Sequence, residues 1–188
     1  MIEQIPANPW NSLEILKLIF STLTPMLIVI IGLFLNQKLK KFEHVQWRNQ
    51  KLIEKRLIIF DEITPLLNDL LCYFTYVGYW KECKPTEIIK LKRILDKKIY
   101  LAKPLFSDDF FIKSLFFVDL CYKPYQGWGE DAKLLTDFNQ RKKAFSNEWD
   151  EKWDNYFANN SNEITNSTQL RKSYYEIMEI LSKDIGIS

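Results

Sequence analysis

The stretch LIFSTLTPMLIVIIGLFL, from Leu18 to Leu35, decides the architecture of this chain. It runs for about 18 residues without a charge, close to the length that a helix needs to cross a roughly 30 Å hydrocarbon core. A water-soluble domain seldom makes a helix that is apolar on all sides. A basic n-region and a small-x-small cleavage site are both missing around it, so a retained anchor is favoured over a cleaved signal peptide. We therefore predict a transmembrane helix over residues 13–36.

Basic residues crowd the C-terminal side of this stretch. They are Lys38, Lys40, Lys41, Arg48, Lys51, Lys55 and Arg56. The positive-inside rule then places residues 1–12 outside the inner membrane and everything after Leu35 in the cytoplasm. Three cysteines without a C-x-x-C pair fit a reducing compartment. We expect the basic segment to contact lipid headgroups, and we favour this over direct binding of nucleic acid.

Small and polar residues recur at helical spacing within the predicted span. This stripe consists of Ser21, Thr24, Pro25, Ile28, Gly32 and Asn36. Small residues let the backbones of neighbouring helices approach closely in lipid, which favours a homo-oligomer. Pro25 leaves the carbonyl of Ser21 without its helical donor and should bend the helix. One helix cannot enclose a channel, so a pore lined by the stripe requires the oligomer. The alternative is a lone anchor.

The remainder is predicted to be all-α. We expect a cytoplasmic helical domain over residues 37–158, a polar linker over 159–168 and an amphipathic helix over 169–188. Pro65 should interrupt or kink the helix that leaves the membrane, and Ser107 should cap another. The expected helices run to about residue 63 and over residues 66–80, 88–102, 110–120, 131–157 and 170–184.

One loop is poorly explained by packing alone and forms a candidate interaction site. Its residues are Tyr125, Gly127, Trp128, Gly129, Glu130 and Asp131. Two glycines around a tryptophan, followed by two acids, indicate a constrained loop. It either recognises a partner or subunit, or it is a turn whose tryptophan lies in the core.

Residue types that support catalysis are sparse. The single histidine, His44, lies beside the basic segment, where a Ser-His-Asp or Cys-His arrangement is hard to build. The cysteines lack a second ligand at zinc-finger spacing. Gly127-Trp128-Gly129 lacks the third glycine of a dinucleotide loop. We therefore predict a protein that is not an enzyme and holds neither a metal nor a cofactor.

This organisation resembles the small membrane accessory protein of type VI-B CRISPR systems, which works beside an RNA-guided RNA nuclease. The resemblance rests on Leu18–Leu35, the basic Lys38–Arg56 helix, and the stretches Trp47–Phe74 and Tyr122–Leu134. It implies a ring-shaped oligomer whose pore depolarises the cell once the nuclease has found phage RNA. An R-x4-6-H nuclease motif, linked with that family, would need an arginine at positions 37–40, which read Gln-Lys-Leu-Lys.

Three functions follow from these expectations. The leading one is a pore-forming antiviral effector that works with an RNA-guided nuclease. The second is a membrane-tethered adaptor that recruits a cytoplasmic partner through the loop at 125–131. The third, least favoured, is a tethered domain that binds or cleaves RNA.

Overall fold

The computed structural model describes residues 12–124, 127, 131–145, 148–158 and 164–187. The chain divides into two compact units, Met1–Gln50 and Lys51–Ser188. Apart from one sheet of two short strands, the regular elements of the described residues are helices. The prediction of an all-α fold with a long apolar helix near the N-terminus is confirmed.

The first helix, α1, extends from Ser12 to Phe74 and is longer than expected. The predicted interruption at Pro65 is wrong, because α1 continues through it without a break. Proline inside a helix costs about 3 kcal/mol or more. Here the ring of Pro65 is exposed, while Ile63, Leu67 and Leu70 on either side are fully buried. Their burial outweighs the local cost of the proline.

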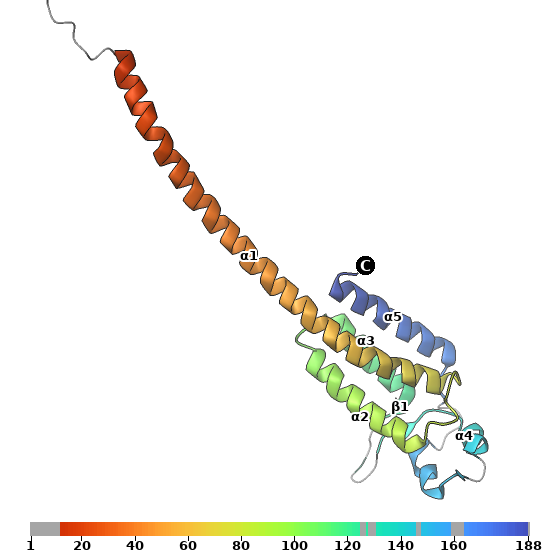
Figure 1. Cartoon of the computed structure of the whole chain (residues 1–188). Helices are drawn as coiled ribbons and strands as arrows, with labels where there is room; N and C mark the ends of the chain where they lie inside the picture. Colours follow the sequence, from red (N-terminus) through yellow and green to blue (C-terminus); the bar gives the residue numbers. More distant parts are fainter. Residues whose placement is uncertain (1–11, 125–126, 128–130, 146–147, 159–163, 188) are drawn as a thin grey trace, which may run out of the picture. The chain divides into compact units, whose positions relative to one another are not determined.

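The last turns of α1 belong to the second unit, where they share a core with α2 (Pro85–Ala102), α3 (Asp108–Cys121) and α5 (Ser167–Ile185) (Figure 1). Each helix contributes apolar residues spaced three or four positions apart, which lie on one helical face. The fully buried residues include Ile63, Leu67, Leu70, Leu95, Ile99, Phe110, Phe117, Leu170, Ile177 and Leu181. The C-terminal helix is therefore part of this core.

Helix starts follow the expected capping chemistry. Pro85 occupies the first turn of α2, where its missing N–H is harmless. The hydroxyl oxygen of Ser107 accepts a hydrogen bond from the Phe110 N–H at 3.4 Å, as predicted. Asn166 caps α5 by accepting from the N–H groups of Thr168 and Gln169, at 2.9 and 3.2 Å.

Replacing Asn166 with alanine should lower the free energy of unfolding of the second unit by about 1 kcal/mol, because two N–H groups of α5 lose their acceptor. Urea unfolding followed by tryptophan fluorescence would measure the change. Asn166→Asp is the control, since its carboxylate can accept the same two bonds and should preserve stability. Equal losses in the two variants would contradict this role of the side chain.

The helix predicted over residues 131–157 is wrong. This segment instead holds β2 (Lys133–Leu134), α4 (Phe138–Phe145) and the 3₁₀ helix η2 (Glu151–Tyr156), and β2 pairs antiparallel with β1 (Tyr122–Lys123), which precedes the segment. Two aspartates divide the segment: Asp137 accepts from the Gln140 N–H at 3.0 Å, and Asp150 from the Lys152 N–H at 2.9 Å. Such side-chain caps start new helices rather than continue an old one.

The aromatic residues of that segment still meet, although no single helix carries them. The ring centroids of Phe138 and Trp149 lie 5.7 Å apart, those of Phe138 and Phe157 5.4 Å, and those of Trp149 and Trp153 5.3 Å. Phe157 is part of the core of the second unit, and Phe138 and Trp149 pack against that core.

Candidate functional site

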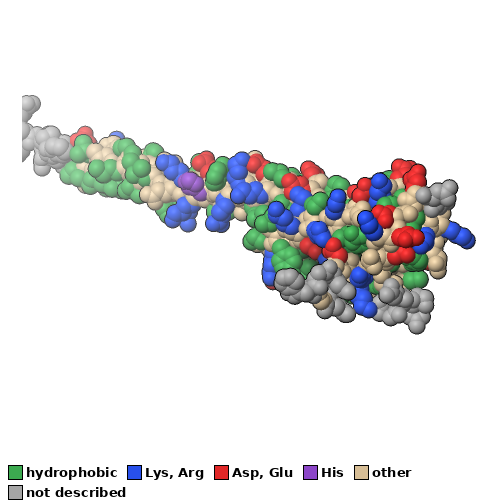
Figure 2. Space-filling view, turned by 90° about the horizontal axis from the view of Figure 1, so that it is seen from below, with side chains coloured by type: hydrophobic (Ala, Val, Ile, Leu, Met, Phe, Trp, Pro, Cys, Tyr) green, Lys and Arg blue, Asp and Glu red, His purple; other side chains and the backbone are tan. Residues whose placement is uncertain are grey.

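The apolar stretch Leu18–Leu35 lies wholly within α1, in the first unit. Within the described part of the chain, α1 is the one helix long and apolar enough to cross a membrane, judged by length and composition. Every residue from Ser12 to Gln50 is exposed. Figure 2 shows the hydrophobic side chains gathered on this part of α1, followed by Lys and Arg side chains around the single histidine.

The small and polar stripe lies on one face of α1, and its hydroxyl groups are engaged within the helix. Ser21 donates to the Leu18 carbonyl at 2.9 Å, and Thr24 donates to the Phe20 carbonyl at 2.7 Å. Thr22, which the sequence reading did not include, donates to the same Leu18 carbonyl at 3.0 Å. Each hydroxyl keeps acceptor capacity for another molecule, but none needs a partner to be tolerated in lipid.

Gly32 is the smallest residue of the stripe, and it is uncrowded. A Cβ atom placed on it would meet nothing within 4 Å. Its lack of a side chain is therefore not required by any neighbour in the described chain. Around Pro25, a shallow apolar groove is lined by Pro25, Met26, Val29 and Ile30.

The seven basic residues predicted as one juxtamembrane set differ in their surroundings. Lys38, Lys40, Lys41 and Arg48 are exposed on the part of α1 in the first unit. Lys51 forms a salt bridge with Glu54 at 2.6 Å, and Lys55 is exposed.

Arg56 is a different case, because it lies in the second unit and its guanidinium group bonds to other segments of that same unit. Nε donates to the carbonyl of Leu105 and Nη1 to the carbonyl of Asp184. The Asp184 carboxylate in turn accepts from the backbone N–H and the hydroxyl of Ser107, at 2.9 and 2.8 Å. Arg56 therefore joins α1 to the turn before α3 and to the end of α5. Its prediction as a lipid-facing residue is corrected: main-chain carbonyls, which attract a cation, hold it in the domain.

The candidate interaction loop connects β1 with β2. Tyr125, Trp128, Gly129 and Glu130 lie outside the described residues, so their predicted roles stay predictions. At the end of the loop, the carboxylate of Asp131 forms a salt bridge with Arg93 of α2. Gly127 is half-buried, and a Cβ placed on it would meet nothing within 4 Å.

The sequence reading missed a buried arginine, Arg141, on α4. Its side chain is 1% exposed, and its guanidinium carbon lies 3.7, 4.2 and 4.9 Å from the ring centroids of Tyr73, Tyr76 and Trp80. It donates to the Tyr73 carbonyl, at the end of α1, and to the Thr136 hydroxyl at 3.2 Å. We call Tyr73, Tyr76, Trp80, Thr136 and Arg141 the arginine cage.

The arginine cage surrounds a buried charge with aromatic rings and neutral acceptors. Among the described residues Arg141 forms no salt bridge, and its Nη1 atom and the Tyr73 hydroxyl have no hydrogen-bond partner. Burial lowers the pKa of Arg141, but a guanidinium group stays charged at neutral pH. The electron-rich ring faces and the carbonyl end of α1 attract that charge. Tyr76, held in the cage, adopts a φ of 59°, a conformation unusual for a bulky residue.

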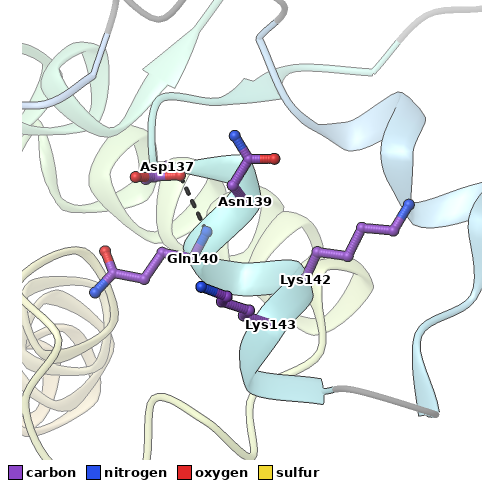
Figure 3. A pocket seen from close by; sticks show the side chains of 5 residues that line it. All are labelled: Asp137, Asn139, Gln140, Lys142 and Lys143. Atoms are coloured by element: carbon purple, nitrogen blue, oxygen red, sulfur yellow. Dashed lines mark hydrogen bonds between the residues drawn. The ribbon is translucent and has the colours of Figure 1, made fainter.

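A second groove and the buried thiol of Cys121 are the other candidate sites in the described part of the chain. A polar groove along α4 is lined by Asp137, Asn139, Gln140, Lys142 and Lys143 (Figure 3). Asp137 caps the helix there, and Lys142 bonds Asp154 at 3.3 Å, so both side chains serve the local fold. Burial raises the pKa of the Cys121 thiol, which keeps it protonated. In the described ranges, no three His, Cys, Asp or Glu side chains are grouped so that they could hold a metal ion.

Comparison with known proteins gives no relative of this chain: no family model matches it, and neither a curated protein nor a solved structure is detectably similar.

Proposed function

We propose that this protein is a single-pass, non-enzymatic effector of the bacterial inner membrane, whose spans associate into a pore that permeabilises the bilayer. In this proposal residues 13–36 cross the membrane, the N-terminus is outside and the helical domain is cytoplasmic. The trigger would be an RNA-guided nuclease acting in the same antiviral pathway, as the resemblance to type VI-B accessory proteins implies.

The observation that carries the proposal is the stripe around Gly32. A residue without a side chain costs helix stability, roughly 1 kcal/mol relative to alanine. No atom of the described chain requires that residue here, since a Cβ on Gly32 would meet nothing within 4 Å. A close approach by another helix in the bilayer would account for it.

Enlarging Gly32 tests self-association. Gly32→Leu should leave the chain folded, because Gly32 lies on an exposed stretch of α1 where a Cβ would meet nothing within 4 Å. If spans pack through the stripe, the variant should run as a monomer after crosslinking in membranes, and a potential-sensitive dye should report at least a tenfold loss of depolarisation, equivalent to about 1.4 kcal/mol.

The control is Leu23→Phe, which adds bulk on the opposite side of the helix at 100° per residue. It should leave both crosslinking and depolarisation unchanged. If Gly32→Leu formed the same oligomers as the wild type, the stripe would not be the interface. A wild-type protein that is monomeric at every concentration would contradict the pore proposal.

A tethered adaptor is the rival function, and one observation favours it. The hydroxyl groups of Ser21 and Thr24 bond to carbonyls of their own helix, so a single span is already satisfied in lipid. Replacing residues 13–36 with an unrelated transmembrane helix separates the two functions. A pore loses its activity after this exchange, whereas an adaptor keeps recruiting its partner.

A further inference from the structure

The basic residues after the apolar stretch lie at different depths relative to a bilayer. Lys38, Lys40 and Lys41 follow Leu35 within six residues, so they lie about 9 Å or less beyond it along a helix that rises about 1.5 Å per residue. The headgroup layer on each side of the hydrocarbon core is about 5–8 Å thick. These three ammonium groups, on long flexible side chains, therefore fall at headgroup depth.

Arg48 lies on the same helical face as Lys41 but two turns farther out, about 20 Å beyond Leu35. Fixed charges are screened over about 8 Å at physiological ionic strength. Even a strongly tilted helix would leave Arg48 well outside the headgroup layer. Lipid headgroups can therefore explain the three lysines but not Arg48.

A shallow groove lies at the same depth. It is lined by Leu35, Asn36, Lys38, Leu39 and Phe42. Lys38 lies at its edge, with Nζ 5.6 Å from the centroid of the Phe34 ring, so the side chain turns back toward the apolar stretch. Apolar residues beside a lysine that bends in this way suit an acyl chain next to a phosphate group. All these residues are exposed, so no other part of the described chain covers them.

The excess of positive charge in this segment favours lipids with anionic headgroups. From residue 36 to residue 50 the sequence holds Lys38, Lys40, Lys41 and Arg48 but a single carboxylate, Glu43. We propose that Lys38, Lys40 and Lys41, with the adjoining groove, form a binding site for anionic glycerophospholipids of the leaflet that they face. This inference rests on the proposed membrane span, and it adds the lipid class and the residues that recognise it.

The test uses the full chain in phosphatidylcholine bilayers that contain some phosphatidylglycerol, with spin-labelled lipids of both kinds. The wild-type protein should prefer phosphatidylglycerol about fivefold at low salt. The triple variant K38Q/K40Q/K41Q should lose that preference, and 1 M NaCl should weaken it in the wild type. Lys41→Gln alone should reduce it measurably, whereas Arg48→Gln, which removes the same charge from the same face, should not.

Each other outcome has a defined meaning. A chain that resists carbonate extraction from pure phosphatidylcholine but shows no lipid preference overturns this inference and leaves the span intact, whereas failure to insert overturns the proposed function itself. Equal effects of Lys41→Gln and Arg48→Gln would overturn the assignment by depth. The wild type could bind labelled single-stranded RNA that the triple variant does not bind, while both proteins show the same lipid preference. That result would overturn the lipid assignment and assign the three lysines to RNA.

Discussion

Replacing Arg141 with alanine is expected to lower the free energy of unfolding of the helical domain by about 3 kcal/mol, a large effect for one residue. Three contributions are lost together: stacking on Tyr73, Tyr76 and Trp80, the bonds to the Tyr73 carbonyl and the Thr136 hydroxyl, and the volume of the side chain. Urea unfolding of the full chain in detergent, followed by tryptophan fluorescence, would measure the loss.

Two further substitutions separate these contributions. Arg141→Met keeps most of the side-chain volume against the rings and should lose about half as much, since burying an apolar chain avoids desolvating a charge. Arg141→Lys keeps the charge but not the planar group that stacks and bonds together, so it should remain clearly destabilising. Asn139→Ala, at an exposed position of α4, is the control and should change stability by less than about 0.5 kcal/mol.

A loss below about 1 kcal/mol in Arg141→Ala would contradict this account of the cage. It would mean that Tyr76 and Trp80 pack equally well without the cation, and that the end of α1 needs no charge near its carbonyls. An Arg141→Lys variant with the same free energy of unfolding as the wild type would also contradict this account, because the charge alone would then be enough to stabilise the domain.

Removing Arg56 should have the second largest effect, lowering the free energy of unfolding by about 2 kcal/mol. Its guanidinium group donates to the carbonyl of Leu105, in the turn before α3, and to the carbonyl of Asp184, in the last turn of α5. Without it, these partly buried carbonyls lose a charged donor. In Arg56→Ala, hydrogen exchange should rise at the end of α5 and in the turn before α3, and tryptophan fluorescence should report a lower urea midpoint.

The neighbouring lysine provides the matched control. Lys55 is exposed, so Lys55→Ala removes the same charge from the same helix without removing a bond to the domain, and stability should be nearly unchanged. If both substitutions had equal effects, the contribution of Arg56 would be general electrostatics rather than its contacts with Leu105 and Asp184.

Local chemistry made several elements predictable. Ser107 as a cap, Pro85 at a first turn and the spacing of apolar residues between 170 and 184 identified three helices, because caps and amphipathic faces depend on residues close in sequence. The prediction of a helix over residues 131–157 was wrong, partly because local caps were overlooked there. Its aromatic spacing looked helical, but Asp137 and Asp150 cap new helices, and β2 pairs with a strand that precedes it in sequence.

Long-range contacts account for what the sequence reading missed. Arg141 appears in the sequence as one of three consecutive basic residues, and Arg56 as the last of seven, so each looks like a surface charge. Arg141 bonds the carbonyl of Tyr73, 68 positions away on α1, and Arg56 bonds a carbonyl 128 positions away. No local pattern reports such contacts.

By itself, the sequence determined that one uninterrupted apolar stretch, Leu18–Leu35, dominates the first unit, because hydrophobicity and length are properties of consecutive residues. It also determined the helical character of the rest. Only the tertiary structure decided that α1 continues through Pro65, that Arg56 belongs to the domain and that Arg141 is buried among aromatic rings. Each of these depends on free energy from residues distant in sequence, which is available only once the chain has folded.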